Sequence, residues 1–223
     1  NNLAETKISR PSDKLDFNHN IEFSNISFSY GDKLVLNNIS FSINKSDIVG
    51  LLGETGVGKT TLLDLLLGFN KPSAGQVLID GKILHRKNIY KLCNSTGYVS
   101  QNIAFLDTTI AKNIAFGVNE ENIDYDLINK LIDCVKLRQL VDSLEDGVMS
   151  TIGENGAKLS GGQCQRLGIA RALYLSPSLI IFDEATNALD PNTEEEIIRS
   201  IKEFTSNEIT IFMITHRLSS VNI

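Results

Sequence analysis

The feature that most constrains this chain is a glycine-rich run at residues 53–60, with the sequence G-E-T-G-V-G-K-T. It matches the phosphate-binding pattern G-x-x-x-x-G-K-[ST]. The apolar run 47–52 before it predicts a buried strand, and residues 61–67 after it predict a helix that Gly68 ends. The glycines let backbone N–H groups surround phosphate oxygens, and the start of the helix adds positive potential. The sequence therefore predicts a phosphate-binding loop between a strand and a helix.

Two side chains of this run have specific expected roles. Lys59 can reach the terminal phosphates of a nucleotide, and the hydroxyl of Thr60 can bind Mg²⁺. The alternative is an ordinary glycine turn before a helix, which the flanking elements and the motifs below disfavour. We expect the following residues to bind nucleotide: Gly53, Glu54, Thr55, Gly56, Val57, Gly58, Lys59, Thr60 and Thr61.

A second candidate site follows the apolar run Leu179–Phe182, which is typical of a parallel strand covered on both faces. Two carboxylates, Asp183 and Glu184, come directly after it, and strand ends are where open α/β sheets bind ligands. Asp183 can hold Mg²⁺ through water, opposite Thr60, while Glu184 can orient and deprotonate an attacking water. Acidic pairs after strands also serve merely to solvate loops, so this signal gains its meaning from the phosphate loop upstream.

The pentapeptide Leu159–Gln163, with the sequence L-S-G-G-Q, is the most distinctive motif. One interpretation is a capping box, S-x-x-Q, at the start of a helix over 160–174. That interpretation leaves Gly161 and Gly162 unexplained, since each costs a helix about 1 kcal/mol relative to Ala. Uncapped N–H groups at a helix start form an anion site, and Ser160 adds a donor. We expect both roles together.

Composition limits the classes of function. A chain of 223 residues allows one large domain or two small ones. The net charge of −6 disfavours broad nucleic-acid binding. Cys93, Cys134 and Cys164 are far apart, with no C-x-x-C, which indicates reduced thiols in a cytosolic setting. No apolar run approaches the ~18 residues of a membrane helix. The chain begins at Asn1 without a Met, so we expect a piece of a longer protein.

The order of the periodic segments alternates between strand and helix, which predicts an α/β domain. Strands are expected at 21–28, 34–36, 39–43, 47–52, 76–79, 95–100, 179–182 and 209–214. Helical patterns occupy 61–67, about 108–144, 160–174 and 191–204.

Taken together, the glycine loop, L-S-G-G-Q and the tripeptide Phe182–Glu184 resemble the nucleotide-binding domain of an ABC transporter of the exporter type. The resemblance covers nearly the whole chain after residues 1–20. It implies the ABC ATPase fold: a P-loop NTPase core with a mainly parallel sheet, an N-terminal antiparallel β subdomain and an inserted helical subdomain at about 102–174. It also implies that residues 1–20 are a linker from an absent transmembrane domain, that 21–223 form the ATPase domain, and that its C-terminal end is truncated.

Further roles come from matching single positions to the family. Tyr30 resembles the aromatic residue that stacks on adenine, and Gln101 the glutamine that contacts nucleotide and Mg²⁺ and senses the membrane domain. His216 resembles the histidine that contacts the γ-phosphate, so the implied catalytic set is Glu184, His216 and Lys59. Asp190 lies in the loop that crosses to a partner's site. Without the resemblance, Tyr30 is an ordinary turn residue, His216 a structural histidine and Asp190 a helix cap.

Some segments refine or depart from the family pattern. The loop Gly153–Gly156 and the segment Thr109–Gly117 resemble exporters, and Gln101–Asp107 is reminiscent of flippases for lipid-linked sugars. Asn187 stands where the family usually has Ser, and Cys164 where a basic residue is common. The chain also stops soon after the last predicted strand, where the family continues. Neither of the two substitutions, at 187 and 164, removes an expected phosphate ligand, so we expect their effects to be modest.

The implied function is ATP hydrolysis, with Mg²⁺, that powers an exporter through head-to-tail dimerisation. ATP would lie between the glycine loop of one subunit and Leu159, Ser160, Gly161, Gly162 and Gln163 of the other, and hydrolysis would release the dimer. The implied partners are a transmembrane domain, in the same or an associated chain, and a second ATPase domain. A homodimer is the simplest arrangement, and a heterodimer stays open. The implied location is the cytoplasmic face of a membrane, with this fragment itself soluble.

Two other classes remain as alternatives. A soluble ABC ATPase acting on nucleic acid or ribosomes is disfavoured by the acidic charge. A nucleotide-binding regulator that does not hydrolyse is disfavoured by the intact Glu184 and His216. A GTPase is rejected because the segment 70–73, N-K-P-S, lacks the Asp of an N-K-x-D base-recognition motif.

Overall fold

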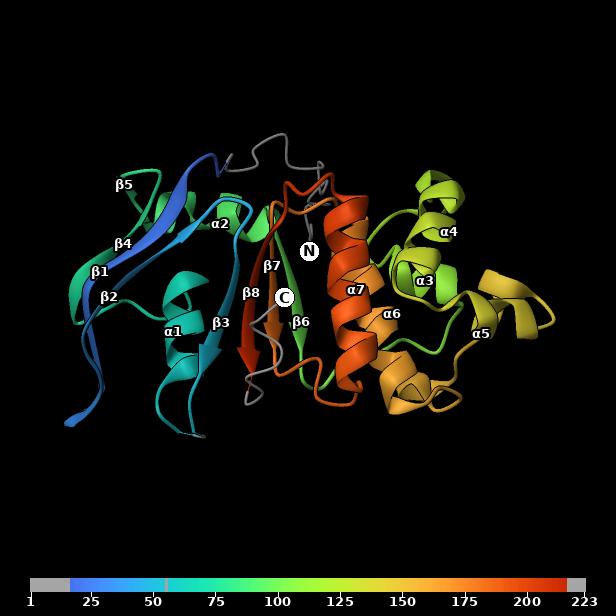
Figure 1. The fold of residues 1–223 in the computed structure, drawn as a ribbon, viewed down its shortest axis with the longest axis horizontal. Coiled ribbons are helices and arrows are strands. Elements are labelled where there is room, and N and C mark those ends of the chain that lie inside the picture. The colour runs from blue at the N-terminus through green and yellow to red at the C-terminus, as the bar shows by residue number, and fades with distance from the viewer. Residues whose placement is uncertain (1–16, 55, 216–223) are drawn as a thin grey trace, which may run out of the picture.

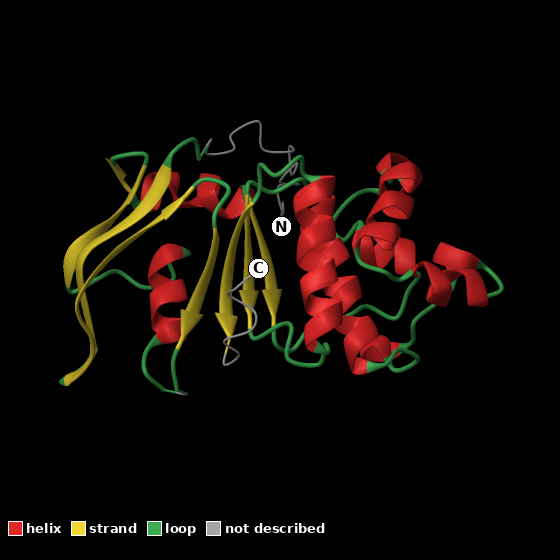
Figure 2. Cartoon of the chain, in the orientation of Figure 1, coloured by secondary structure: helices red, strands yellow, loops and turns green. Residues whose placement is uncertain are grey.

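The computed structural model describes residues 17–54 and 56–215 of the chain, which form two four-stranded sheets and the helices around them (Figures 1 and 2). The antiparallel sheet has the order β2-β1-β4-β5, with β1 Asn20–Tyr30, β2 Lys33–Asn44, β4 Ala74–Ile79 and β5 Lys82–Ile83. The parallel sheet has the order β3-β8-β7-β6, with β3 Ile48–Leu52, β8 Thr210–Thr215, β7 Leu179–Asp183 and β6 Thr96–Ser100. The α/β fold class with an antiparallel β subdomain is thus confirmed.

The hairpin of β1 and β2 follows from alternating apolar residues on either side of a tight turn. Gly31 in that turn has a φ of 57°, which glycine adopts without strain. The two short strands expected at 34–36 and 39–43 are one continuous strand, β2. Asn38 takes a left-handed φ of 51°, and the β1–β2 register shifts there, so the polar break in the pattern is a bulge rather than a gap.

The parallel sheet is the middle layer of the domain, and both of its faces are covered (Figure 1). Ile180 and Phe182 of β7 pack into a core with the helices α6 (Gly161–Tyr174) and α7 (Pro191–Phe204). Their neighbours Leu179 and Ile181 pack on the other side with α1 (Lys59–Leu66) and the antiparallel sheet. Burial on both faces explains why β7 reads as a continuous apolar run. The helices are α1 Lys59–Leu66, α2 Arg86–Asn94, α3 Ile110–Ile114, α4 Tyr125–Cys134, α5 Arg138–Ser143, α6 Gly161–Tyr174 and α7 Pro191–Phe204.

The helical part of the chain lies beyond α6 on one side of the parallel sheet (Figure 2). The pattern expected over 108–144 is three short helices, α3, α4 and α5, rather than one long element. Thr109 and Asp124 begin α3 and α4 as N-caps, with side chains that accept hydrogen bonds from the N–H groups of Lys112 and Leu127. The 3-10 turns between and after these helices are Glu120–Asn122, Gly147–Met149 and Glu154–Gly156.

Residues 17–20, expected to be the end of a linker, pack onto the antiparallel sheet; residues 1–16 lie outside the described part. Phe17 is 2% exposed. The carboxylate of Asp80 accepts hydrogen bonds from the backbone N–H groups of Asn18, His19 and Asn20 at 2.8, 2.7 and 3.0 Å. Burial works to raise the pKa of Asp80, but the three donors together lower it. Asp80 therefore fixes the start of β1 to the β4–β5 turn.

We expect Asp80→Asn to lower the free energy of unfolding by about 1–2 kcal/mol at pH 7, because charge-assisted hydrogen bonds are lost. Since the folded pKa is lowered, the stabilisation is present above the unfolded value of about 3.9 and is lost as the pH falls through the folded pKa. Urea unfolding of wild type and Asp80→Asn should therefore give free energies of unfolding that differ by a constant amount from pH 7 to about 5. Below about pH 4 this difference should shrink. Asp107→Asn, at an exposed loop aspartate, is the matched control. It should change neither the free energy of unfolding nor its dependence on pH.

Candidate nucleotide site

The carboxyl ends of the four parallel strands form one row, and the predicted site residues come directly after it (Figure 1). In the register, Leu51 of β3 pairs with Ile214 of β8, Ile214 with Asp183 of β7, and Asp183 with Ser100 of β6. The glycine loop, Glu184 and Gln101 continue from this row. The fold therefore brings together residues that are separated by more than a hundred positions in the sequence, as open α/β sheets do at their binding edge.

The glycine loop joins β3 to α1 with the backbone that its sequence predicts. Gly56 and Gly58 have φ values of 85° and 104°, which residues other than glycine rarely adopt. A Cβ at Gly58 would also lie 2.9 Å from Leu36 and 3.0 Å from Val35 of β2. Gly58 is the N-cap of α1 and makes no side-chain cap hydrogen bond, so backbone donors of the first turn are available to an anion. Thr55 lies outside the described residues.

Lys59 is buried, at 7% exposed, and its Nζ donates to the carbonyl oxygens of Gly53 and Glu54 at 2.8 Å each. The ammonium is therefore held inside the loop by two acceptors that phosphate oxygens could replace. Thr60 is exposed beside it, and Thr61 is buried in α1. The loop thus carries one buried cation and one accessible hydroxyl.

Asp183, the carboxylate that ends β7, has a partner that the sequence analysis missed. The hydroxyl of Tyr98 donates to Oδ2 of Asp183 at 2.7 Å. Burial, and then this hydrogen bond, raise the pKa of Tyr98 well above its usual value, so the phenol stays a donor. Burial, and then the charge of Asp183, raise the pKa of Asp64 in α1. Tyr98, Asp64 and Asp183 thus form a polar cluster that could be recognised only once the strand order was known.

Glu184, the expected general base, has a strained backbone. Its φ is 53°, unusual for a residue other than glycine, and its N–H donates to the carbonyl of Ile214 at 3.1 Å. Nδ2 of Asn187 lies 3.4 Å from Oε2 of Glu184. The departure at 187, Asn in place of Ser, therefore puts an amide donor next to this carboxylate.

The donor set suits Mg²⁺. Thr60, Gln101 and Asp183 offer a hydroxyl, an amide oxygen and a carboxylate, which are the hard oxygen ligands that this ion prefers. Within residues 17–54 and 56–215, no group of three or more His, Cys, Asp or Glu side chains could hold a metal. These residues fit an ion whose coordination is completed by phosphate oxygens and water rather than by a protein cage.

The L-S-G-G-Q segment begins α6 as the expected capping box. The hydroxyl of Ser160 accepts from the N–H of Gln163 at 3.3 Å, and the N–H of Ser160 donates to Oε1 of Gln163 at 2.7 Å. A Cβ at Gly161 would meet only Ala188 Cβ, at 3.7 Å, an ordinary contact, and neither Gly161 nor Gly162 has a positive φ. Crowding and backbone conformation inside the chain therefore do not require glycine at 161.

The segment 187–190, expected to cross to a partner, is held between α6 and α7. The side chain of buried Gln165 accepts from the N–H of Ala188 at 3.0 Å. Asp190 is the N-cap of α7 and accepts from the N–H of Thr193 at 3.0 Å, and hydrogen bonding with the side chain and then the backbone of Thr193 lowers the pKa of Asp190. The capping role is therefore present, and the side of Asp190 that does not cap faces solvent.

Tyr30, the expected adenine-stacking residue, is 51% exposed at the end of β1. Its ring packs edge-on against Phe28, with centroids 4.9 Å apart, and its hydroxyl accepts from Nδ2 of Asn70 at 3.3 Å. An exposed, oriented ring is available for stacking on a base. His216, expected to contact the γ-phosphate, lies outside the described residues.

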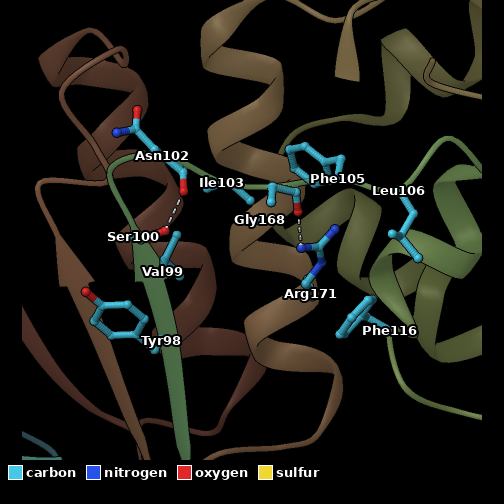
Figure 3. Close-up of a pocket in the computed structure, with 11 residues that line it drawn as sticks. Tyr98, Val99, Ser100, Asn102, Ile103, Phe105, Leu106, Phe116, Gly168 and Arg171 are labelled. Atoms are coloured by element: carbon cyan, nitrogen blue, oxygen red, sulfur yellow. Dashed lines mark hydrogen bonds between the residues drawn. The ribbon is translucent and has the colours of Figure 1, made fainter. Parts of the chain in front are cut away.

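A groove of about 370 Å³ lies beside Gln101, between β6, the segment 102–106 and α6 (Figure 3). Arg171 of α6 joins two segments that flank the groove. Its guanidinium donates hydrogen bonds to the carbonyl oxygens of Ala104 and Asn113 at 2.7 and 2.8 Å. It also lies 4.5 Å from the ring centroid of Phe105 and 5.3 Å from that of Phe116. Phe116 is half-exposed, so the groove has an apolar rim around a fixed cation.

None of the helices within the described residues is long and apolar enough to cross a membrane.

Comparison with known proteins places these features in a family. A family model described as "ABC transporter" matches residues 36–187. Over 204 residues the chain is 37% identical to the ATP-dependent lipid A-core flippase of Ralstonia nicotianae, covering 90% of this chain and 34% of that relative. It is 38% identical over 205 residues to the protein of that name in Burkholderia thailandensis, covering 90% and 34%.

Among solved structures, a bacterial Atm1-family ABC exporter with ATP bound matches with a TM-score of 0.84 and 32% identity. The match covers 95% of this chain and 37% of that one. The chain thus spans about a third of the length of these relatives. With the glycine loop, the carboxylate pair and the capped L-S-G-G-Q helix in one α/β fold, the chain belongs to the ABC transporter family and forms an ATPase domain of that family.

Proposed function

We propose that the chain hydrolyses Mg²⁺-ATP at a site shared by two copies, and that this cycle powers an exporter. The observation that carries the proposal is the position of two anion-binding elements in one chain. The glycine loop begins α1, whose apolar residues pack on one face of the parallel sheet, and L-S-G-G-Q begins α6, whose apolar residues pack on the other (Figure 1). Because the sheet lies between them, the two elements of a single chain do not bind the same nucleotide. In a head-to-tail pair, the glycine loop of one copy and the L-S-G-G-Q segment of the other bind one nucleotide together.

The glycine loop binds the phosphates in this proposal. Backbone N–H groups of 53–60 surround the phosphate oxygens, and Lys59 exchanges its two carbonyl acceptors for them. Mg²⁺, when bound with the nucleotide, neutralises the developing charge on the phosphates. Thr60, Gln101 and, through water, Asp183 are the residues that would hold it. Tyr30 stacks on the adenine.

Glu184 acts as the general base. It follows Asp183 at the end of β7, so its carboxylate lies at the edge of the sheet where the terminal phosphate is bound. From there it orients a water and accepts its proton as the water attacks the γ-phosphorus, while the bond from that phosphorus to the bridging oxygen breaks and ADP leaves. His216 is proposed to contact the γ-phosphate.

The second copy completes the site. Ser160 and the N–H groups of Gly161 and Gly162 bind the γ-phosphate in trans, which gives Gly161 a function that packing within the chain does not supply. Asp190 lies in the loop that crosses to the partner. Contacts to the γ-phosphate exist with ATP and not with ADP, so hydrolysis separates the pair. A homodimer is the simplest pair, because the described motifs are intact.

We infer that a transmembrane domain docks in the groove lined by Arg171, Phe105 and Phe116, directly after Gln101. The groove has an apolar rim, as partner surfaces do. The relatives named above are flippases and an exporter by their names, which supports transport of a lipid or lipid-linked sugar from the cytoplasmic face of a membrane. Residues 21–223 would be the ATPase domain, with 102–174 as its helical subdomain.

A concentration series tests the shared site. We expect phosphate release per molecule from Mg²⁺-ATP to be low at dilute protein and to rise with protein concentration, because the active species is a pair. Light scattering run in parallel should show a dimer that appears with ATP and is lost with ADP. Rapid, concentration-independent turnover by a protein that stays monomeric would contradict the shared site, and no phosphate release at any concentration would contradict hydrolysis itself.

A further inference from the structure

Tyr98 of β6 lies beside Asp183, the carboxylate that ends β7. Tyr98 is one of the residues around the groove, but Figure 3 shows its ring on the opposite side of β6 from Ile103, Phe105 and Arg171. The hydroxyl of this ring donates to Oδ2 of Asp183 at 2.7 Å. The position is half-exposed, so the ring is not required to fill the core.

The sheet fixes both partners of this hydrogen bond. Tyr98 of β6 pairs with Ile181 of β7, and Ser100 pairs with Asp183. Because side chains two residues apart point to the same face of a strand, Tyr98 and Asp183 are diagonal neighbours on one face of hydrogen-bonded parallel strands. The backbone therefore sets their separation, and no loop has to move to form the contact.

The charges around Asp183 make a neutral donor useful there. Asp64 of α1 lies close enough for the two carboxylates to repel each other. A phenol that donates to Oδ2 stabilises the ionised carboxylate without adding a cation that would compete with a bound metal. Among the described residues, Oδ1 of Asp183 accepts no hydrogen bond, so its lone pairs are available to metal-bound water.

We propose that Tyr98 is a positioning residue for the magnesium-nucleotide complex, acting through Asp183: its hydroxyl fixes the rotation of the carboxylate so that Oδ1 is presented to water in the shell of Mg²⁺. This inference rests on the proposed function, since it assigns a partner to a residue of that site. Partners that orient a metal ligand typically contribute about 10- to 100-fold in affinity or activity. Because Asp183 is expected to act through water, we place the effect near the lower limit.

The test is Tyr98→Phe, which removes the hydroxyl and keeps the ring. The measurement is calorimetric titration with the imido analogue of ATP, which is not hydrolysed, at a series of Mg²⁺ concentrations and in EDTA. We expect the Mg²⁺ concentration at half-maximal enhancement of binding to rise about 10-fold, with unchanged affinity in EDTA. Tyr125→Phe, at a tyrosine of similar exposure that begins α4, is the matched control and should match wild type in both arms.

The two arms separate this inference from the proposed function. If wild type shows no Mg²⁺-dependent nucleotide binding, the proposed function fails. If wild type binds and Tyr98→Phe has the same Mg²⁺ midpoint, only the role of Tyr98 is overturned. Equal loss of affinity with Mg²⁺ and in EDTA also overturns it, since general damage to the fold acts on both arms alike.

Discussion

Glu184→Gln is expected to lower steady-state ATP hydrolysis by about 10²- to 10⁴-fold while leaving ATP binding intact, because general bases contribute rate enhancements of this size. The amide keeps the shape of the side chain and can still contact Asn187, whose amide lies 3.4 Å from the carboxylate. It cannot accept the proton of the attacking water. ATP then persists in the site, and so do the contacts that hold two copies together.

The measurement is phosphate release alongside gel filtration in Mg²⁺-ATP, where the variant should accumulate as an ATP-bound dimer. Glu203→Gln, on the exposed face of α7, is the matched control and should hydrolyse ATP like wild type. Unchanged turnover in Glu184→Gln would exclude Glu184 as the base. Loss of both turnover and nucleotide binding would point instead to damage at the strained backbone of this residue.

Most of the fold could be predicted from the sequence because its signals are local. The capping box of Ser160 and Gln163 and the N-cap of Asp190 each depend on residues three apart, and both are present. The helix expected over 191–204 has those bounds, and the fully buried strand at 179–182 differs by one residue. Where local patterns were ambiguous, as at Asn38 in β2, the partner strand decided the outcome.

The missed parts of the site depend on contacts between distant segments. Tyr98 and Asp183 are 85 positions apart, and nothing near Tyr98 in the sequence distinguishes it from an ordinary strand tyrosine. The same holds for Arg171, which reaches Ala104 across 67 positions. Only the order of strands β6 and β7 and the packing of α6 bring these groups together. The roles assigned to single residues of the site, including Thr55 and His216, remain predictions.

The groove and the nucleotide edge share β6, which suggests how docking and hydrolysis are linked in one domain. Strand β6 carries Tyr98, which contacts Asp183, and Gln101 directly follows β6 and begins the segment that Arg171 fixes. A partner seated against Phe116 would therefore press on the segment that follows β6, the strand whose Tyr98 contacts Asp183 of the proposed metal site. Rigid packing transmits such small displacements, since closely packed cores do not deform continuously.

Lys59→Ala is expected to weaken Mg²⁺-ATP binding by about 100-fold, or about 2.7 kcal/mol, since charge-assisted contacts to the terminal phosphates are lost. ADP binding should weaken less, because the γ-phosphate is missing and fewer of those contacts exist. The fold should survive, because among residues 17–54 and 56–215 Nζ of Lys59 donates hydrogen bonds only to the carbonyls of Gly53 and Glu54, both in the loop itself. Calorimetric titration with ATP and with ADP, together with thermal unfolding, measures all three quantities.

The difference between the two nucleotides is what makes this variant informative. A lysine that merely braces the loop would lower affinity for ATP and ADP by the same factor, because both need the loop intact. A lysine that reaches the terminal phosphates lowers affinity for ATP more. Lys112→Ala, which breaks an exposed 2.9 Å ion pair with Glu120, is the matched control and should alter neither affinity. Wild-type ATP affinity in Lys59→Ala would remove Lys59 from the site, and with it the strongest reason to place the triphosphate in this loop.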